Sequence, residues 1–455
     1  MIGLLLLFAL AIMIITGLSL AAWILSSREA TYYDLFGLGI PLGIGWVTMA
    51  QFLSGSLLHG VTQIFVVTVL SLGVSGMAIF QVKLRNSGLR NAELSPWWLV
   101  ILLLQFLFMV WQTLFDSMHA DGLLLWEFKA HLAFLNGGSI PREYFSDPSR
   151  LWSHQDYPLM LPMLETWVYQ WIGESNQTLA KAPFPLFYLA AAALMIGGAQ
   201  RLSGQPWRGA LAAVLMGFIP SLTLEPGGAA SGWGDFPLAV CYLGAVVFLL
   251  HFLKTNSCES LYAFAGMSAL LPWVKNEGVV LWGCLLVVLA VICWIHRALA
   301  SFFRAAIPTL AVLVLWKCFV AVMHAPKLKD FVPVTLETLQ ANAGRIPILA
   351  LAVPQQIIDF DRWSLLWPVA FVALWLLVRR QRNREALVFA WGIFFPITLF
   401  SGVYLFSAWP DYRFHFATSF PRLLVDVAPV ALFLLGLVIP RMIFDRKHTP
   451  PASLE

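Results

Sequence analysis

The sequence contains few charged residues and lacks the short motifs of several soluble enzyme classes. Only 11% of its 455 residues are Asp, Glu, Lys or Arg, whereas a soluble domain carries about 25%. This deficit excludes an ordinary soluble fold. The sequence also holds no Walker-type phosphate loop, no Rossmann glycine pattern and no H-E-x-x-H motif. Chemistry that uses nucleotide sugars, or a zinc protease site, is therefore poorly supported.

Cysteine is scarce as well, and its spacing points to no cross-link. The five cysteines form no C-x-x-C pair and lie in or at the ends of apolar runs, at Cys241, Cys258, Cys284, Cys293 and Cys318. We therefore predict neither a disulfide framework nor a metal site from cysteine. The net charge is only +4, and the excess comes from Lys and Arg in loops, so we expect no nucleic-acid partner.

Long hydrophobic runs are what the sequence has in abundance. Hydrophobic residues make up 60% of the chain, and the mean hydropathy is +0.78. A helix crosses the hydrocarbon core with about 20 apolar residues. The sequence therefore predicts an all-α polytopic membrane protein with about 13 transmembrane helices. The predicted spans are 2–26, 35–55, 59–82, 97–115, 182–199, 209–223, 235–253, 258–274, 278–295, 304–323, 363–378, 386–407 and 423–440.

The distribution of Lys and Arg predicts the orientation of these spans. If the basic loop 83–96 is cytoplasmic, most other basic loop residues, including the Arg379–Arg384 cluster, fall on the same side. The run 2–26 has no basic n-region and no A-x-A cleavage site, so we predict a retained helix. The sequence thus suggests a bacterial inner membrane protein with three long segments on the periplasmic or exterior side, namely 116–181, 324–362 and 408–422.

We divide the chain accordingly. Residues 1–96 are predicted to form an N-terminal three-helix membrane segment, residues 97–445 a membrane core, and residues 446–455 a cytoplasmic tail. The stretch 345–358 is apolar but short, and we predict a re-entrant or interfacial helix there. If it spanned the membrane, the Arg379–Arg384 cluster would face outward, against the bias of the other basic residues.

The long interruption 116–181 carries polar residues in an unusual grouping. Asp121, Trp126, Glu127 and Lys129 follow D-x4-W-E-x-K spacing, and His154-Gln155-Asp156-Tyr157-Pro158 comes later. Charges are costly near a bilayer, so a charged cluster beside apolar helices indicates a site. Further unusual residues fall on the same predicted side of the membrane, at Asp235, Lys275, Glu277, Arg413 and Arg422. The sequence therefore predicts one extracytoplasmic site assembled from several loops.

Five blocks resemble the GT-C superfamily of integral-membrane glycosyltransferases, of the broad family-39-like type. They are Asp121-x4-Trp126-Glu127-Phe128-Lys129-Ala130, His154-x-Asp156-Tyr157-Pro158-Leu159, Gly234-Asp235-Phe236-Pro237-Leu238-Ala239, Val274-Lys275-Asn276-Glu277-Gly278 and Phe420-Pro421-Arg422-Leu423-Leu424. The ordered set covers roughly residues 97–430. Two features depart from the family pattern. The first loop offers two separated acids, Asp116 and Asp121, and three spans precede residue 97.

The resemblance implies transfer of a sugar from a polyprenyl-phosphate carrier to a lipid, glycan or protein acceptor on the outer face. Such chemistry needs a base for the acceptor proton and cations near the leaving phosphate. We predict Asp121 as the base and Asp235 as a second catalytic acid. The predicted substrate and phosphate-binding residues are Lys129, His154, Asp156, Tyr157, Lys275, Glu277, Arg413 and Arg422. No metal ligand is predicted, although a divalent cation stays open as a cofactor.

Simpler roles remain open for several of these residues. Asp235 can instead favour the N-terminus of a helix. Lys275 and Glu277 can form an interfacial pair, and Arg422 can snorkel to the membrane surface. Two other functions are also alternatives, a flippase or transporter of lipid-linked glycans and a polysaccharide polymerase or ligase. A transporter would place charges near the midplane and show inverted repeats, and a polymerase or ligase needs no acidic base.

Overall fold

The computed structural model describes residues 1–25, 30–84, 93–118, 120–380 and 384–444. Within these ranges the chain is almost entirely helical, and its one β-type pairing is the isolated antiparallel bridge between Phe331 and Ser407. Nine described helices are long and apolar enough to cross a membrane, or ten if one bent pair counts as a span. The predicted all-α membrane architecture is therefore confirmed.

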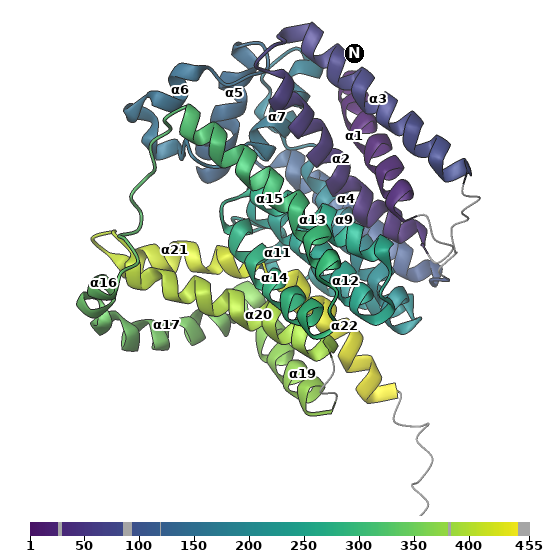
Figure 1. The fold of residues 1–455 in the computed structure, drawn as a ribbon, viewed down its shortest axis with the longest axis vertical. Coiled ribbons are helices and arrows are strands. Elements are labelled where there is room, and N and C mark those ends of the chain that lie inside the picture. Colours follow the sequence, from purple (N-terminus) through teal and green to yellow (C-terminus); the bar gives the residue numbers. More distant parts are fainter. Residues whose placement is uncertain (26–29, 85–92, 119, 381–383, 445–455) are drawn as a thin grey trace, which may run out of the picture.

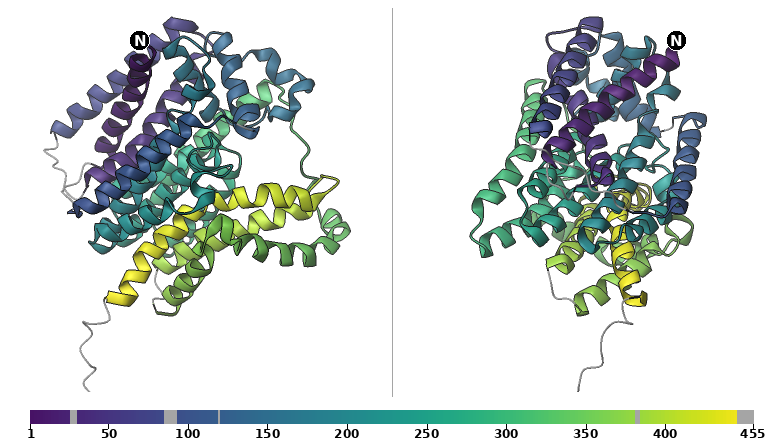
Figure 2. Two further views of the ribbon diagram at one scale, coloured as in Figure 1. Left: turned by 180° about the vertical axis from the view of Figure 1, so that it is seen from behind. Right: turned by 90° about the vertical axis from the view of Figure 1, so that its right-hand side faces the viewer.

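The helices form two groups in space (Figure 1). The first half of the chain contains α1 (Ile2–Ile24), α2 (Tyr32–Ser54), α3 (Gly60–Leu84), α4 (Pro96–Phe115), η1 (Gly122–Glu127), α5 (Phe128–Leu135), α6 (Arg142–Ser146), η2 (Pro148–Ser153), α7 (Met160–Ile172), α8 (Gln177–Ala180), α9 (Phe184–Ser203), α10 (Pro206–Met216) and α11 (Pro220–Thr223). The views in Figure 2 place the N-terminal helices at one end of the molecule and the C-terminal helices at the other.

The second half begins with three long helices near the middle of the molecule and continues into the C-terminal group (Figure 1). Its helices are α12 (Asp235–Thr255), α13 (Cys258–Val274), α14 (Glu277–Ile295), α15 (Leu299–Val322), α16 (Leu336–Ala341), η3 (Ala343–Arg345), α17 (Ile346–Ile357), α18 (Phe360–Trp363), α19 (Leu366–Arg380), α20 (Arg384–Gly402), η4 (Val403–Phe406), α21 (Tyr412–Val425) and α22 (Ala428–Phe444).

The prediction of 13 spans is not confirmed, because four predicted spans are short or broken. The predicted span 209–223 contains most of α10 and the four-residue α11, which begins at Pro220. Proline lacks the N–H that a continuing helix needs. The helix at 258–274 has only 17 residues. The predicted span 363–378 contains a break at Ser364, whose φ is +51°. The predicted span 423–440 belongs to a helix pair bent by 45°.

The stretch 345–358 forms the 12-residue helix α17. In α17 only Leu349 and Ile357 are buried, while Leu351 is 71% exposed. Twelve residues rise only about 18 Å, well short of the roughly 30 Å hydrocarbon core. The helix is thus too short to cross, and its apolar exposure suits a position at the membrane interface.

Close backbone contact joins the first two helices. A side chain at Gly17 would collide with the carbonyl oxygen of Gly39 at 1.9 Å, and one at Gly43 would collide with that of Met13 at 2.0 Å. Small residues allow helices in membranes to approach closely enough for dispersion contacts along both backbones. The glycines in α1 and α2 therefore hold these two helices against each other.

Helix α12 forms the centre of the structure and positions the site. In an apolar stretch of 18 residues within α12, 94% of the residues are buried inside the protein. Asp235, the first residue of α12, is fully buried. Its carboxylate thus lies within the protein and away from lipid, where only other protein groups can compensate its charge.

Candidate active site

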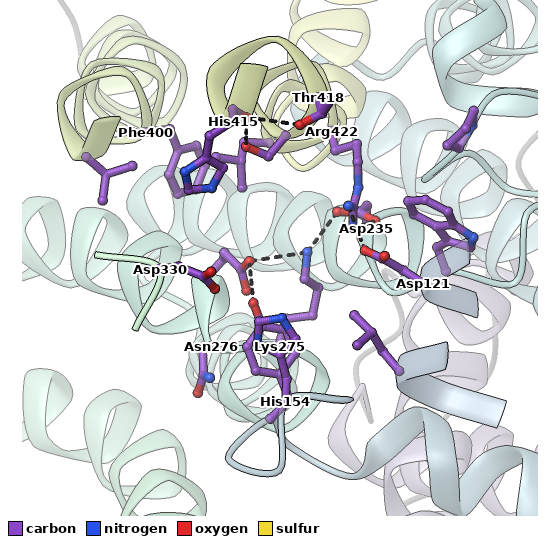
Figure 3. Close-up of a pocket in the computed structure, with 18 of the residues that line it drawn as sticks. Asp121, His154, Asp235, Lys275, Asn276, Asp330, Phe400, His415, Thr418 and Arg422 are labelled. Atoms are coloured by element: carbon purple, nitrogen blue, oxygen red, sulfur yellow. Dashed lines mark hydrogen bonds and ion pairs between the residues drawn. The ribbon is translucent and has the colours of Figure 1, made fainter. Parts of the chain in front are cut away.

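A large cavity lies where α12 and α14 begin, between the loop 116–181 and the C-terminal helices. Its volume is about 1090 Å³, and residues of the loop 116–181, of α12, α14 and α20, and of α21 line it. Eight of the ten predicted site residues belong to this lining, namely Asp121, His154, Asp156, Tyr157, Asp235, Lys275, Glu277 and Arg422. Residues separated by up to 301 positions thus share one space (Figure 3).

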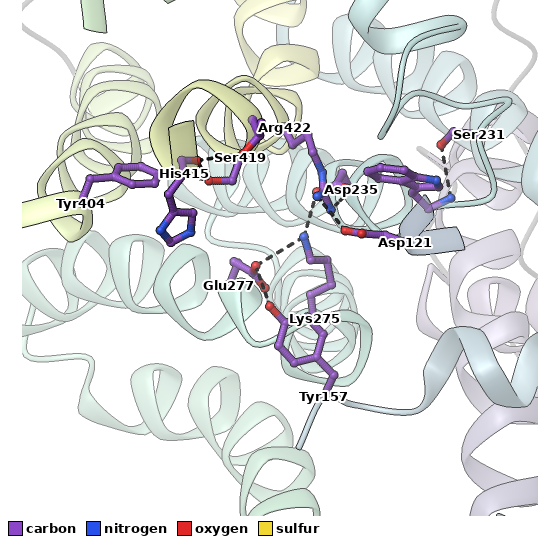
Figure 4. Close-up of polar contacts among 12 residues, drawn as sticks. Asp121, Tyr157, Ser231, Asp235, Lys275, Glu277, Tyr404, His415, Ser419 and Arg422 are labelled. Carbon is purple, nitrogen blue, oxygen red and sulfur yellow. Dashed lines mark hydrogen bonds and ion pairs between the residues drawn. The ribbon is translucent and has the colours of Figure 1, made fainter. Parts of the chain in front are cut away.

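An ionic network occupies the floor of the cavity. Lys275 Nζ lies 2.8 Å from Asp235 Oδ1, and Arg422 Nη2 lies 3.3 Å from Asp235 Oδ2. The other amino group of Arg422, Nη1, lies 2.7 Å from Asp121 Oδ2. Lys275 Nζ also approaches Glu277 Oε1 at 3.4 Å. The network therefore joins four chain segments through two cations and three carboxylates (Figure 4).

Lys275 stays charged in this network. Burial by itself would lower the pKa of its ammonium, but the carboxylates of Asp235 and Glu277 raise the pKa above the usual value. The side chains of Lys275 and Asp235 are only 3% and 1% exposed. Charges so deeply buried hold their position only when each has partners of opposite sign.

Local structure explains how these residues reach the cavity. Asp235 and Glu277 begin α12 and α14, where carboxylates interact favourably with the N-terminus of a helix. Arg422 lies in the last turn of α21, where a cation is favoured. The first turns of α12 and α14, the last turn of α21 and the loop between α13 and α14 therefore meet at this cavity.

Asp121 lies where the backbone departs from regular helix. It directly precedes the six-residue π-helical turn η1, and Ala120 before it has a φ of +41°. Such irregular backbone is costly for residues other than glycine and is concentrated at functional sites. A side chain at Gly122 would approach Trp233 at 3.0 Å and Met118 at 2.9 Å. Gly122 therefore allows the Asp121 turn to pack directly on Trp233.

Trp233 supports Arg422 from the other side. The guanidinium carbon of Arg422 lies 4.3 Å from the centre of the Trp233 ring. A guanidinium stacks favourably on an indole face. Arg422 is thus held by a ring and by two carboxylates, while its Nε has no hydrogen-bond partner in the described part of the chain. This Nε is a buried donor that remains available to a ligand.

Lys129 lies behind the cavity lining and does not face the space itself. Its ammonium is fully buried, donates to the backbone oxygen of His154 at 2.9 Å, and lies 5.4 Å from the Trp126 ring centre. Burial lowers the pKa of Lys129 to about 7, although the Asp156 carboxylate acts in the opposite direction. Lys129 therefore positions the chain at His154 and makes no contact with the cavity.

His154 and Tyr157 form a wall of the cavity. Their rings lie 4.6 Å apart, and the Tyr157 hydroxyl donates to Glu277 Oε1 at 3.4 Å. Burial lowers the pKa of His154 and raises that of Tyr157 well above its usual value. His154 has a φ of +51°, so its backbone makes a tight turn. Both rings are uncharged near neutral pH and present flat surfaces to the cavity.

Arg413 is the other predicted site residue that does not line the cavity. It lies in the first turn of α21 and is exposed, and its backbone N–H donates to Asp411 Oδ1 at 3.0 Å. The two arginines of α21 thus differ in position, because Arg422 faces the network and Arg413 faces outward.

The structure adds residues that the sequence did not single out. Asp330 Oδ1 accepts from Trp409 Nε1 at 2.9 Å, and Trp409 stacks on His415 at 4.5 Å. Beside them, the N–H of Val332 donates to the Phe406 oxygen at 2.8 Å. The strand-like segment 330–332 therefore pairs with 406–408 and closes one side of the cavity.

Asp426 is a second acid that sequence reasoning missed. It is fully buried, and neither of its carboxyl oxygens has a hydrogen-bond partner within the described residues. It lies between α21 and α22, in an otherwise apolar stretch. A charge in such a stretch is itself a signal of function, and this signal could have identified Asp426.

The cavity also has an apolar side. Leu399, Phe400 and Val403 come from α20 and the turn after it, and Phe414 and Leu423 come from α21. Val280 of α14 faces the same space. No group of three or more His, Cys, Asp or Glu side chains in the described ranges is arranged to hold a metal ion. The site therefore combines an ionic floor with an apolar wall.

No family model and no curated protein matches the chain. The chain is similar to the crystal structure of ArnT from Cupriavidus metallidurans bound to undecaprenyl phosphate, with 17% sequence identity and a TM-score of 0.47. The match covers 76% of this chain, which spans 61% of that one.

Proposed function

We propose that the protein transfers a glycosyl group from a polyprenyl-phosphate carrier to an acceptor on the face of the membrane that carries this cavity. One observation supports the proposal above the others. Arg422, whose Nε has no hydrogen-bond partner among the described residues, stands beside the carboxylate of Asp121 in a cavity that continues onto an apolar wall. A lipid-phosphate donor needs both surfaces at once, because its phosphate is anionic and its chain is apolar.

The donor can be placed by its chemistry. Its phosphate lies against Arg422 and Lys275, since guanidinium and ammonium groups form charge-assisted hydrogen bonds to phosphate oxygens. Its prenyl chain leaves along Leu399, Phe400 and Val403 toward the lipid. The sugar then lies near Trp233, Tyr157 and His154, whose rings offer the flat apolar surfaces usual in small-molecule sites.

The transfer step assigns a role to each part of the network. An acceptor hydroxyl attacks the anomeric carbon, a bond forms from the acceptor oxygen to that carbon, and the bond from the carbon to the phosphate oxygen breaks. Asp121 takes the acceptor proton as the base. Arg422 and Lys275 stabilise the negative charge that develops on the departing lipid phosphate. Asp235 holds both cations in place.

The acceptor reaches the cavity from the aqueous side under this proposal. The segment 330–332 and the Trp409–His415 pair border that side. Asp156, Asp330 and Glu225 also line the cavity, and their oxygens can accept hydrogen bonds from hydroxyl groups. We propose no sugar identity, since carboxylate oxygens can accept hydrogen bonds from the hydroxyl groups of many sugars.

The proposal is tested in cells that lack the protein. Such cells should accumulate the polyprenyl-phosphate sugar and lack the glycan that receives it, as measured by mass spectrometry of extracted lipids. The wild-type chain should reverse both changes. Asp121→Asn keeps the shape of the side chain and removes its charge, so it should restore neither. Restoration by Asp121→Asn would contradict the role of Asp121 as the base.

The two arginines of α21 provide a matched comparison. A charge-assisted contact contributes about 1.5–3 kcal/mol, so Arg422→Ala should raise the donor concentration needed for half-maximal transfer by about ten- to a hundredfold. Arg422→Lys should restore only part of the donor affinity, because an ammonium cannot form the two parallel hydrogen bonds of a planar guanidinium. Arg413→Ala removes the same charge from an exposed position and should leave the kinetics unchanged. Equal effects at both positions would contradict the assignment.

A further inference from the structure

A second cavity lies at the opposite end of the helices that carry the candidate active site. Its volume is about 410 Å³. Residues near the ends of α12 and α14 line it, together with Arg384 at the start of α20. Helix α12 has 21 residues and begins at Asp235 in the first cavity, so the two cavities are about 30 Å apart along its axis. They therefore face opposite sides of the membrane.

The second cavity is at the level of a membrane interface. Trp294 and Ile295, in the last turn of α14, are 75% and 67% exposed. They directly precede His296, which lines the cavity. Exposed Trp beside apolar residues at the end of a spanning helix is typical of the headgroup level of a bilayer. The cavity thus opens where lipid headgroups meet the hydrocarbon core.

The polar part of this cavity is a cation without an acidic partner. Arg384 Nη2 lies 2.5 Å from His296 Nε2. A guanidinium only donates hydrogen bonds, so the imidazole nitrogen accepts and the pair keeps one positive charge. Among the described residues, no carboxylate lies within ion-pair distance of Arg384.

The remainder of the cavity is largely apolar. Phe252, Leu253 and Ile292 form its walls. The ammonium of the nearby Lys254 is already hydrogen-bonded, because it donates to the backbone oxygens of Arg201 and Leu202 at 3.2 and 2.8 Å. The cavity therefore offers one available guanidinium above an apolar pocket.

We propose that this cavity binds the phosphate headgroup of an anionic membrane phospholipid from the leaflet opposite the candidate active site. The Arg384 guanidinium binds the phosphate oxygens, and the apolar walls receive the first carbons of the acyl chains. The bias of Lys and Arg toward one side of a membrane accounts for the sign of the loop charge. This bias does not explain why Arg384 lies in a cavity with apolar walls at the level of the lipid headgroups. This inference does not depend on the proposed glycosyl transfer.

Binding of a short-chain lipid to the purified full-length protein in neutral detergent tests the proposal. The probes are short-chain phosphatidylglycerol, short-chain phosphatidylcholine and inorganic phosphate, titrated by calorimetry below the critical micelle concentration of each lipid. Phosphatidylglycerol should bind, and phosphatidylcholine should bind about tenfold more weakly, since it carries no net charge. Equal binding of the two lipids would overturn the proposal. Inorganic phosphate that binds as tightly as phosphatidylglycerol would instead assign the cavity to a free anion.

Variants separate this cavity from the general surface charge. Arg384→Gln should weaken phosphatidylglycerol binding by about tenfold or more. Ala298→Phe, which fills the cavity without changing charge, should weaken it to a similar degree. The matched control is Arg304→Gln. Arg304 is an exposed cation near the start of α15, which follows the cavity residue Ala298, and it does not line the cavity. If Arg304→Gln weakens phosphatidylglycerol binding as much as Arg384→Gln does, the lipid is attracted to the positive charge of the whole surface, and the proposal is overturned.

Discussion

Replacing Asp235 should reveal how strongly the floor of the candidate active site depends on paired charge. Asp235→Leu removes a fully buried carboxylate that contacts Lys275 at 2.8 Å and Arg422 at 3.3 Å. Arg422 keeps its ion pair with Asp121 at 2.7 Å, whereas the one ion pair that Lys275 keeps with a described residue is that with Glu277 at 3.4 Å. Removing one partner of a buried ion pair costs roughly 3–5 kcal/mol. We expect a loss of that size for Asp235→Leu and also for Lys275→Met.

The double variant should be less destabilised than the sum of the two single variants. It removes both buried charges and leaves side chains of similar volume, a change that is often close to neutral. Contacting residues show coupling energies up to about 3 kcal/mol, and we expect a value near this upper limit for Asp235 and Lys275. Reversible unfolding in mixed micelles with increasing SDS, followed by tryptophan fluorescence, gives the four free energies of unfolding.

An exposed ion pair in the same protein provides the control. Arg150 and Asp147 are 3.1 Å apart, but their side chains are 36% and 35% exposed. Exposed pairs contribute roughly 0–1 kcal/mol, so the Arg150→Met and Asp147→Leu cycle should give a small coupling. A coupling for Asp235 and Lys275 no larger than this control would refute the view that burial makes the network strong.

Three further predictions follow from single features. Burial lowers the pKa of Lys129 from its ordinary value of 10.5 to about 7 in the folded protein. Between these pH values the unfolded chain binds more protons than the folded protein, so the free energy of unfolding should rise as pH increases from about 7 to 10. Lys129→Met should flatten this rise in unfolding measurements at pH 6 and 9, and an unchanged slope would contradict the assignment. Gly43→Leu should separate α1 from α2 and lower stability by several kcal/mol, about as much as a severe overpacking change, whereas equal thermal stability of the two proteins would contradict the packing. In a Cys318→Ser background, an impermeant thiol reagent applied to intact cells should label a cysteine introduced at Ser149 and should not label Cys258; labelling of both would overturn the predicted orientation.

The sequence predicted the helical membrane fold well because hydropathy depends on local composition. Most of the long apolar runs became long helices at nearly the predicted positions. The count of thirteen spans was not confirmed where local breaks divide an apolar run, as at Pro220 and Ser364. Such breaks depend on backbone geometry and on neighbouring helices, and hydropathy averaged over a window does not detect them.

Most of the predicted site residues line one cavity, and the detailed geometry of that cavity could not be predicted from the sequence. Charged residues on one predicted face pointed to Asp121, Asp235 and Arg422, and these side chains are in direct contact. The sequence could not distinguish Arg413 from Arg422, because which side of α21 faces the cavity depends on tertiary packing. Asp426 was not predicted, because it lies inside the apolar run that the sequence assigns to the span 423–440. The topology itself stays a prediction, and so does the cytoplasmic position of Asn383, which lies outside the described residues.

The spacing of the ionic network along the chain has a consequence for biosynthesis. Asp235 and Lys275 are 40 residues apart, whereas Asp235 and Arg422 are 187 residues apart. During membrane insertion, α12, α13 and α14 therefore leave the ribosome carrying an acid and a base that can neutralise each other long before Arg422 is made. A nascent chain ending after α14 should already insert stably. The later arrival of α21 then brings Arg422 to the carboxylates of Asp121 and Asp235, so the second cation of the network is added last.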